Sequence, residues 1–140
     1  MGHIKTDAEG NKKVSPDLHG FEEVTGAKTV SNDDNGKILG VTGAHTLTLP
    51  KIGGDKGAGE MPIGSHLVVA NVGGSAVVVQ TNAGDGITGR IANASADSVA
   101  DGTLGNSLTS AATDGAYVKI VALTATQWYI VGGVGVWTYA

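Results

Sequence analysis

Residues 115–133 have the sequence GAYVKIVALTATQWYIVGG, and this stretch decides the fold that we predict for the chain. Residues 117–123 and 128–131 are rich in β-branched and apolar side chains, and the small or polar residues 124–127 separate them. Two such runs with a short polar link are typical of a β-hairpin. Because both faces of the hairpin are largely apolar, we expect a central hairpin that is covered on both sides.

A second hairpin is expected in residues 65–81, SHLVVANVGGSAVVVQT, where Gly73 and Gly74 fit a two-residue turn. That register pairs Val68 with Val79 and places both side chains on the core face. Trp128 is the largest apolar group available to the core, and it should be the main packing anchor. The predicted core anchors are Trp128, Val68, Val79 and Ile120.

The composition favours an all-β chain with many turns. Of the 140 residues 23 are Gly, and Val, Thr and Ala are abundant whereas good helix formers are few. We expect an antiparallel β-sandwich or jelly-roll-like domain over residues 27–140, preceded by an extended N-terminal arm, residues 1–26. Further strands are expected near residues 28–30, 37–41, 45–49, 86–91, 107–111 and 134–139.

Charge and cysteine content argue against several functional classes. A formal net charge of −4 without a basic patch argues against binding to nucleic acid. No apolar run is long enough to span a membrane. The chain has no cysteine, which excludes disulfides and thiolate metal sites. The histidines are far apart in the sequence, and we expect no metal and no cofactor.

The arm, residues 1–26, is polar with mixed charges and spaced apolar residues. Two interpretations stay open: an unstructured terminus, or an arm that becomes ordered only against a partner. In the second case its apolar and basic side chains are the candidate contacts with that partner. These residues are Ile4, Lys5, Lys12, Lys13, Val14, Leu18 and Phe21.

Two motifs suggest ligand chemistry but are better explained as turns. Residues 84–89, GDGITG, match the glycine pattern of dinucleotide sites, but a strand-like sequence follows where a helix is required. Residues 31–36, SNDDNG, resemble part of a calcium loop, yet Ser31 and Thr42 stand where carboxylates are needed. No nucleophile motif and no acid/base pair can be nominated, so we expect a protein that is not an enzyme.

The order of the motifs is more informative than any one of them. The chain runs NGKILGV, HTLTLP, SHLVVANVGGSAVVVQT, GDGITG and GAYVKIVALTATQWYIVGG. This order resembles small β-sandwich modules of tailed-bacteriophage virion proteins. The resemblance covers roughly residues 27–133, and it implies a structural, non-enzymatic role in the virion.

Within that family the resemblance is greatest to capsid decoration (cement) proteins, because a module and a polar arm make up the sequence. It implies binding to the major capsid protein on the outer capsid surface, stabilisation of the head and a homotrimer. Apolar residues on two faces of each hairpin also favour association: Val69, Val78, Val121 and Leu123.

The alternative is a head-fibre or tail-fibre module that binds a host receptor or carbohydrate. Its stacking surface would come from Tyr117, Tyr129, Trp137 and Tyr139.

Overall fold

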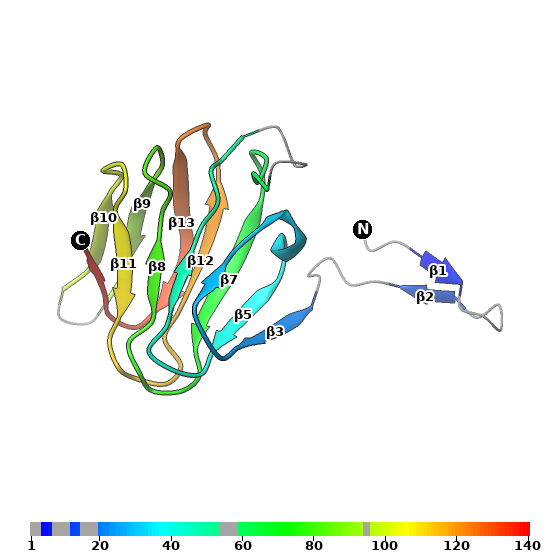
Figure 1. Cartoon of the computed structure of the whole chain (residues 1–140). Coiled ribbons are helices and arrows are strands. Elements are labelled where there is room, and N and C mark those ends of the chain that lie inside the picture. The colour runs from blue at the N-terminus through cyan, green and yellow to red at the C-terminus, as the bar shows by residue number, and fades with distance from the viewer. Residues whose placement is uncertain (1–3, 7–11, 15–19, 54–58, 94–95) are drawn as a thin grey trace.

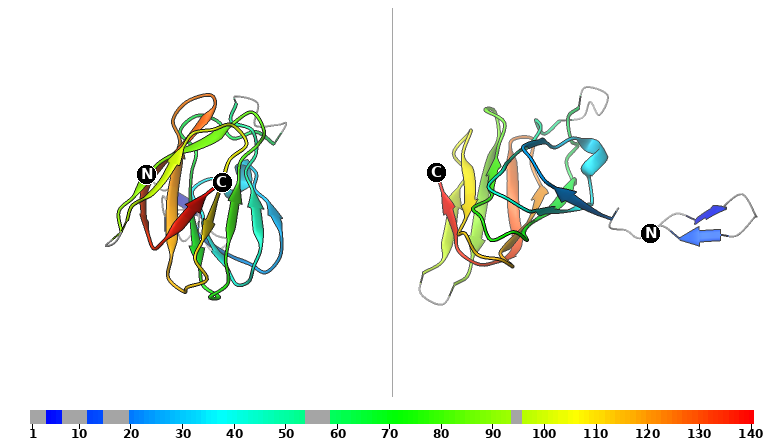
Figure 2. Two further views of the ribbon diagram at one scale, coloured as in Figure 1. Left: turned by 90° about the vertical axis from the view of Figure 1, so that its left-hand side faces the viewer. Right: turned by 60° about the horizontal axis from the view of Figure 1, so that its bottom comes forward.

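The computed structural model describes residues 4–6, 12–14, 20–53, 59–93 and 96–140. Two β-sheets face each other as a sandwich (Figure 1), which confirms the all-β sandwich expected from the sequence. Figure 2 shows the same two layers from two further directions. Within the described residues the helical structure consists of one 3-10 turn, η1 (Asn32–Asp34).

The larger sheet has seven strands, which are, in spatial order, β10 (Ser98–Asp101), β9 (Gly86–Ile91), β13 (Gln127–Val134), β12 (Tyr117–Ala122), β7 (His66–Asn71), β5 (Ile38–Val41) and β3 (Phe21–Val24). The smaller sheet has five strands, which are β14 (Trp137–Tyr139), β11 (Ser107–Ser110), β8 (Val78–Gln80), β6 (Thr46–Thr48) and β4 (Lys28–Thr29). A separate antiparallel hairpin is formed by β1 (Ile4–Thr6) and β2 (Lys12–Val14).

The central hairpin forms as expected. Strand β12 pairs antiparallel with β13, and it is the middle strand of the seven-stranded sheet. Val118, Ile120 and Ala122 alternate with outward-facing residues and are fully buried in the core. Trp128 is also fully buried, so the β-branched and aromatic residues of this stretch form the centre of the core.

The second expected hairpin does not form. Strand β7 belongs to the seven-stranded sheet and β8 to the five-stranded sheet, so Gly73 and Gly74 carry the chain across from one sheet to the other. Asn71 holds this crossover: its side-chain oxygen accepts hydrogen bonds from the backbone N–H groups of Gly73 and Gly74 at 3.3 and 3.0 Å. Gly73 packs against the backbone carbonyl of Thr42, where a Cβ atom would clash.

One predicted core anchor, Val68, is wrong, because β7 and β8 belong to different sheets. Leu67 and Val69 of β7 are fully buried, and Val68 between them faces outward and is half-buried. A shift of one position turns every side chain of a strand to the opposite face of the sheet. Because β7 pairs with β12 and β5 and not with β8, its inward face is not set by the register that the predicted hairpin assumed. Val79, Ile120 and Trp128 lie in the core, whereas Val69 needs no partner chain to cover it.

From β3 to β9, successive strands alternate between the two sheets, so the chain winds around the core (Figure 1). A strand that returns to the same sheet after such a turn runs parallel to its predecessor. Accordingly β5 is parallel to β3 and β7, and β6 is parallel to β4 and β8. Outside this alternating run, β13 is also parallel to β9. The sheets are therefore mixed, where the sequence analysis expected antiparallel pairing throughout.

The sandwich begins before residue 27, the boundary expected from the sequence. Strand β3 pairs with β5 as an edge strand of the seven-stranded sheet, and Val24 is buried in the core. Residues 20–26 thus belong to the domain and not to the arm. Among the described residues, no helix is long and apolar enough to cross a lipid bilayer.

Candidate docking surface

The outer face of the seven-stranded sheet carries rows of mainly apolar side chains, which also contain Lys119 of β12 and Glu23 of β3. Strand register places Phe21, Ile38 and Val68 side by side across β3, β5 and β7. The next row along contains Gly40, Ala70 and Tyr117. These positions alternate with the buried Leu39, Val69 and Val118, so they point away from the core.

A groove of about 480 Å³ opens on this face, and we call it the apolar groove. The exposed fractions of Val72 and Tyr117, 48% and 39%, show that the protein leaves large apolar side chains in contact with water here. Contiguous exposed apolar surface is typical of interaction sites. The groove is lined by Ile38, Val68, Ala70, Asn71, Val72, Asp114, Gly115 and Tyr117.

Phe21 extends this surface towards the sheet edge. Its side chain is 62% exposed, and its ring lies over Gly40. A Cβ atom at residue 40 would come 2.5 Å from Cε1 of Phe21 and 3.6 Å from Cγ2 of Val72. Gly40 therefore leaves room for the Phe21 ring, and the apolar surface continues from the groove onto β3.

The outer face of the five-stranded sheet has a different character. Register places Thr46, Val78, Thr109 and Thr138 in one row, and Thr29, Thr48, Gln80 and Ser107 in the next. We call this uncharged, hydroxyl-rich surface the hydroxyl face. Water can hydrogen-bond to nearly all of its side chains, so the two outer faces of the sandwich differ in polarity.

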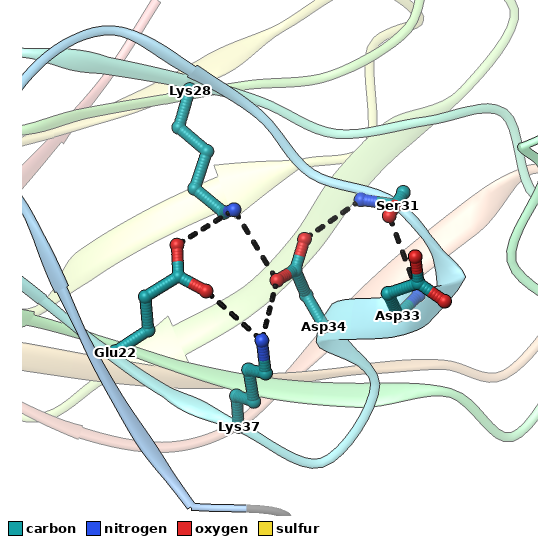
Figure 3. Close-up of polar contacts among 6 residues, drawn as sticks. All are labelled: Glu22, Lys28, Ser31, Asp33, Asp34 and Lys37. Carbon is teal, nitrogen blue, oxygen red and sulfur yellow. Dashed lines mark hydrogen bonds and ion pairs between the residues drawn. The ribbon is translucent and has the colours of Figure 1, made fainter.

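Four charged residues fasten β3 to the rest of the sandwich (Figure 3). Glu22 accepts from the ammonium groups of Lys28 and Lys37 at 2.8 and 2.9 Å, and Asp34 Oδ1 lies 3.3 Å from both. Because β3 also bears Phe21, this ion-pair cluster fixes the strand that extends the apolar surface.

The ion pairs shift the ionisation of their members. Hydrogen bonds from Lys28 and Lys37 lower the pKa of the Glu22 carboxyl group. Partial burial opposes the charge of Lys28, but its hydrogen bonds to Glu22 and Asp34 outweigh that effect and raise its pKa. The hydrogen bond to Glu22 likewise raises the pKa of Lys37. All three groups are therefore held in their charged forms at neutral pH.

The segment that resembles a calcium loop is a capped turn. Ser31 Oγ accepts from Asp33 N at 3.3 Å, and Asp34 Oδ2 accepts from Ser31 N at 3.0 Å, which is a capping box around η1. Asp34 also pairs with lysines, so its oxygens are already occupied. Over the described part of the chain, no cluster of three or more His, Cys, Asp or Glu is arranged to hold a metal ion.

The glycine motif at residues 84–89 is a turn that leads into β9, and no helix follows it. Asp85 within this turn is fully buried, and its Oδ2 accepts from Ile52 N at 2.8 Å. Burial raises the pKa of the Asp85 carboxyl group, because the charged form loses its hydration. The hydrogen bond from Ile52 joins the Asp85 turn to the start of the loop that follows β6.

The predicted contact residues lie in three places. Ile4 and Lys5 are in β1, and Lys12, Lys13 and Val14 are in β2, where register pairs Ile4 with Val14 and Lys5 with Lys13. Phe21 is in β3 and exposed. Leu18 lies outside the described residues.

Sequence reasoning missed Ile38, Val72 and Asp114, which line the groove from different parts of the chain. Residues 66–72, HLVVANV, are apolar at positions that point to both faces of the strand. This pattern could have indicated an apolar outer surface on this strand.

The aromatic residues proposed for a stacking surface do not share one site. Tyr117 lines the apolar groove, whereas Trp137 is buried in the core. Tyr139 donates from its hydroxyl group to Thr103 Oγ1 at 2.9 Å, which ties β14 to the loop after β10.

No protein-family profile matches this sequence, and comparisons with the curated proteins and with the solved structures gave no significant match.

Proposed function

We propose that this protein is a decoration (cement) protein of a tailed bacteriophage, which binds the major capsid protein on the outer head surface and stabilises the head without catalysis. The observation that carries the proposal is the large apolar surface on the seven-stranded sheet, which includes the apolar groove and the exposed Phe21. A surface of this kind is suited to covering by another protein.

Two further features support this role. The motifs that resemble phage virion modules supply β5, β6, β7, β8, the start of β9, β12 and most of β13, so they lie together in one sandwich. The two outer faces differ in polarity, which suits a protein that has its apolar face against other protein, either the shell or a neighbouring copy, and its hydroxyl face towards water. A homotrimer on the head surface, with β1–β2 and the residues around them adding contacts to the capsid, belongs to the same proposal.

Cryo-electron microscopy of the virion of the encoding phage tests the proposal. We expect density for the sandwich repeated over the outer head surface, in contact with the major capsid protein. Density confined to fibres would instead favour a head-fibre or tail-fibre module that binds a host receptor or carbohydrate. Absence of the chain from purified particles would contradict both assignments.

Stabilisation is tested by rebinding purified protein to heads that lack it. Decorated heads should rupture at a higher temperature than bare heads, because ligands that bind only the intact state stabilise it. Heads incubated with an unrelated β-sandwich protein of similar charge serve as the control. Equal rupture temperatures at full occupancy would refute the stabilising role.

A further inference from the structure

Asn35 and Gly36 form the centre of a tight turn between η1 and β5. The backbone angles of Asn35, φ −56° and ψ 125°, and the φ of 85° at Gly36 are those of a type II turn. Lys37 N donates to Asp34 O at 3.0 Å, which is the hydrogen bond that closes such a turn. Because the second central residue of this turn has a positive φ, the fold favours glycine at residue 36.

The turn is fastened to the start of β7 by hydrogen bonds that we call the Asn35 clamp. His66 N donates to Asn35 Oδ1 at 3.0 Å, and Gly36 N donates to His66 O at 2.7 Å. Asn35 Nδ2 donates to Ser65 Oγ at 3.3 Å. Ser65 Oγ itself donates to Pro62 O at 2.7 Å, so its hydrogen is committed and it acts as an acceptor towards Asn35. The clamp therefore needs an amide side chain at residue 35.

The pair that the turn selects is also an especially reactive one for spontaneous deamidation. In this reaction the backbone nitrogen of the following residue attacks Cγ of the asparagine, and a glycine there leaves the approach open because it has no Cβ atom. In the folded chain Gly36 is buried and its N–H is bound to His66 O. The amide of Asn35 is held on Ser65 and His66. The attack therefore requires that the turn first leaves β7.

We propose that Asn35–Gly36 is a latent modification site, which the Asn35 clamp protects from deamidation in the folded protein and which cannot form the clamp again once it has reacted. A bond forms between Gly36 N and Asn35 Cγ, and the bond from Cγ to Nδ2 breaks. The proton of the Gly36 N–H leaves with Nδ2 as ammonia, and a succinimide ring remains. Water then adds to either carbonyl of the ring and opens it to aspartate or isoaspartate. Water is the only co-reactant.

Both products disrupt the clamp. Isoaspartate routes the main chain through the former side chain and lengthens the turn, so the hydrogen bond from Lys37 N to Asp34 O loses its geometry. Aspartate has no N–H to donate, and its carboxylate faces Ser65 Oγ, whose hydrogen is already committed. A buried acceptor without a donor is destabilising. Because Asp34 also holds Lys28 and Lys37, loss of the clamp loosens the ion-pair cluster that fastens β3.

Peptide mapping of the full chain tests the protection. The protein is kept in mildly alkaline buffer with and without urea that unfolds it, and mass spectrometry quantifies the products at residue 35. We expect the folded chain to react more slowly by roughly tenfold or more, because the turn must open first. Asn82, which precedes Ala83, is the internal reference and should react more slowly than Asn35 in urea. Equal rates at Asn35 with and without urea, or no reaction in urea, would overturn the proposal.

Two serine variants separate the clamp from the stability of the whole domain. Ser65→Ala removes the oxygen that accepts from Asn35, so it should accelerate deamidation of the folded chain several-fold without changing the rate in urea. Ser110→Ala is the matched control, because Ser110 is also buried and its oxygen accepts from Asn71 and Val77 at the opposite end of β7. Equal acceleration by both variants would show that global unfolding controls the reaction, which contradicts protection by the clamp. The comparison of wild-type protein with and without urea stands even if Ser65→Ala does not fold.

The effect of the reaction is measured on aged protein. Deamidated chains carry an added negative charge, so ion exchange separates them from unreacted chains. They should melt at a lower temperature, as should Asn35→Asp. In the control Asn82→Asp the carboxylate keeps the role of the Asn82 oxygen, which accepts from Gly84 N at 3.1 Å, so this variant should melt like wild type. A deamidated fraction that melts with the unreacted protein would show that the clamp forms again, and the second part of the proposal would be wrong.

Discussion

At the scale of single residues, Trp128 is the largest side chain that the core encloses completely. Truncation to Ala would remove the ring from the middle of the sandwich and leave a cavity. We expect Trp128→Ala to lower the free energy of unfolding by about 3–5 kcal/mol, measured by urea denaturation.

The matched variant Trp128→Phe keeps an aromatic ring and removes an indole N–H that has no hydrogen-bond partner in the described structure. An unpaired buried donor is costly, so this variant should lose much less stability than Trp128→Ala. A loss below about 0.5 kcal/mol for Trp128→Ala, as at surface positions, would contradict the central place of Trp128 in the core.

Asp85 makes a prediction about pH. Because burial raises its pKa, the folded protein holds the Asp85 proton more tightly than the unfolded chain does. This contribution favours folding at pH values below the ordinary carboxyl pKa of about 4, and it is lost as the pH rises through the folded pKa. Asp85→Asn does not titrate, so its melting temperature should rise relative to wild type as the pH is raised from about 4 to about 8.

Asp97 provides a matched control for this measurement. It is an exposed carboxylate whose pKa is lowered by the hydrogen bond from Arg90, the direction opposite to Asp85. The melting temperature of Asp97→Asn, relative to that of wild type, should not rise over the same pH range. A difference between Asp85→Asn and wild type that does not change with pH would show that Asp85 titrates normally in the folded protein.

At the scale of elements, β3 decides where the domain begins. Deletion of residues 1–19 removes no strand of the sandwich, and the remaining chain should unfold at nearly the wild-type temperature. Deletion of residues 1–26 also removes β3, the Glu22 ion pairs and the buried Val24. It leaves β5 as an exposed edge, which invites aggregation.

We therefore expect the longer deletion to lower the melting temperature or to yield insoluble protein, and the shorter deletion to do neither. Circular dichroism and a solubility assay of the two variants decide this. Equal stability of both would mean that β3 contributes nothing to the sandwich.

The difference between the two predicted hairpins shows what sequence patterns can determine. Residues 117–131 form a hairpin because both strands join the same sheet, so the local alternation and the tertiary structure agree. The turn at Gly73 and Gly74 has an equally good local signal, yet it leads into the facing sheet. A glycine pair permits a tight turn, but it does not specify whether the next strand pairs with its neighbour or packs opposite it.

Strand β3 was missed because two of its four residues are glutamates, which are rare in strands. Glu22 is stabilised by Lys28 and Lys37, contacts that sequence patterns do not reveal. Of the candidate surface, the sequence named Phe21 as a contact candidate of the arm, and the structure places it exposed on β3; the contact itself stays a prediction. The apolar groove could not be predicted, because its lining comes from three strands and two loops that only the winding of the chain brings together.

At the scale of the whole molecule, the winding of the chain produces two outer faces of unequal polarity. The five-stranded sheet presents hydroxyl groups to water, whereas the seven-stranded sheet presents Phe21, Val72 and Tyr117. The formal net charge of −4 is small for a chain of 140 residues, so charge repulsion between copies is weak. The apolar face is therefore the part of the molecule most in need of a partner.

The last prediction concerns the mass of the protein in solution. If a second copy covers the apolar face, light scattering at micromolar concentration should give three times the chain mass of 13.9 kDa.

Val68→Glu places a charge in the groove and should yield monomers, because burial of an unpaired carboxylate opposes association. Thr48→Glu adds the same charge on the hydroxyl face and should remain trimeric. Both side chains point away from the core, so both variants should keep the wild-type fold, which their circular dichroism spectra check. A stable monomer for the unmodified chain would contradict association in solution, and a cryo-electron microscopy map of the decorated head would then show whether three copies meet only there.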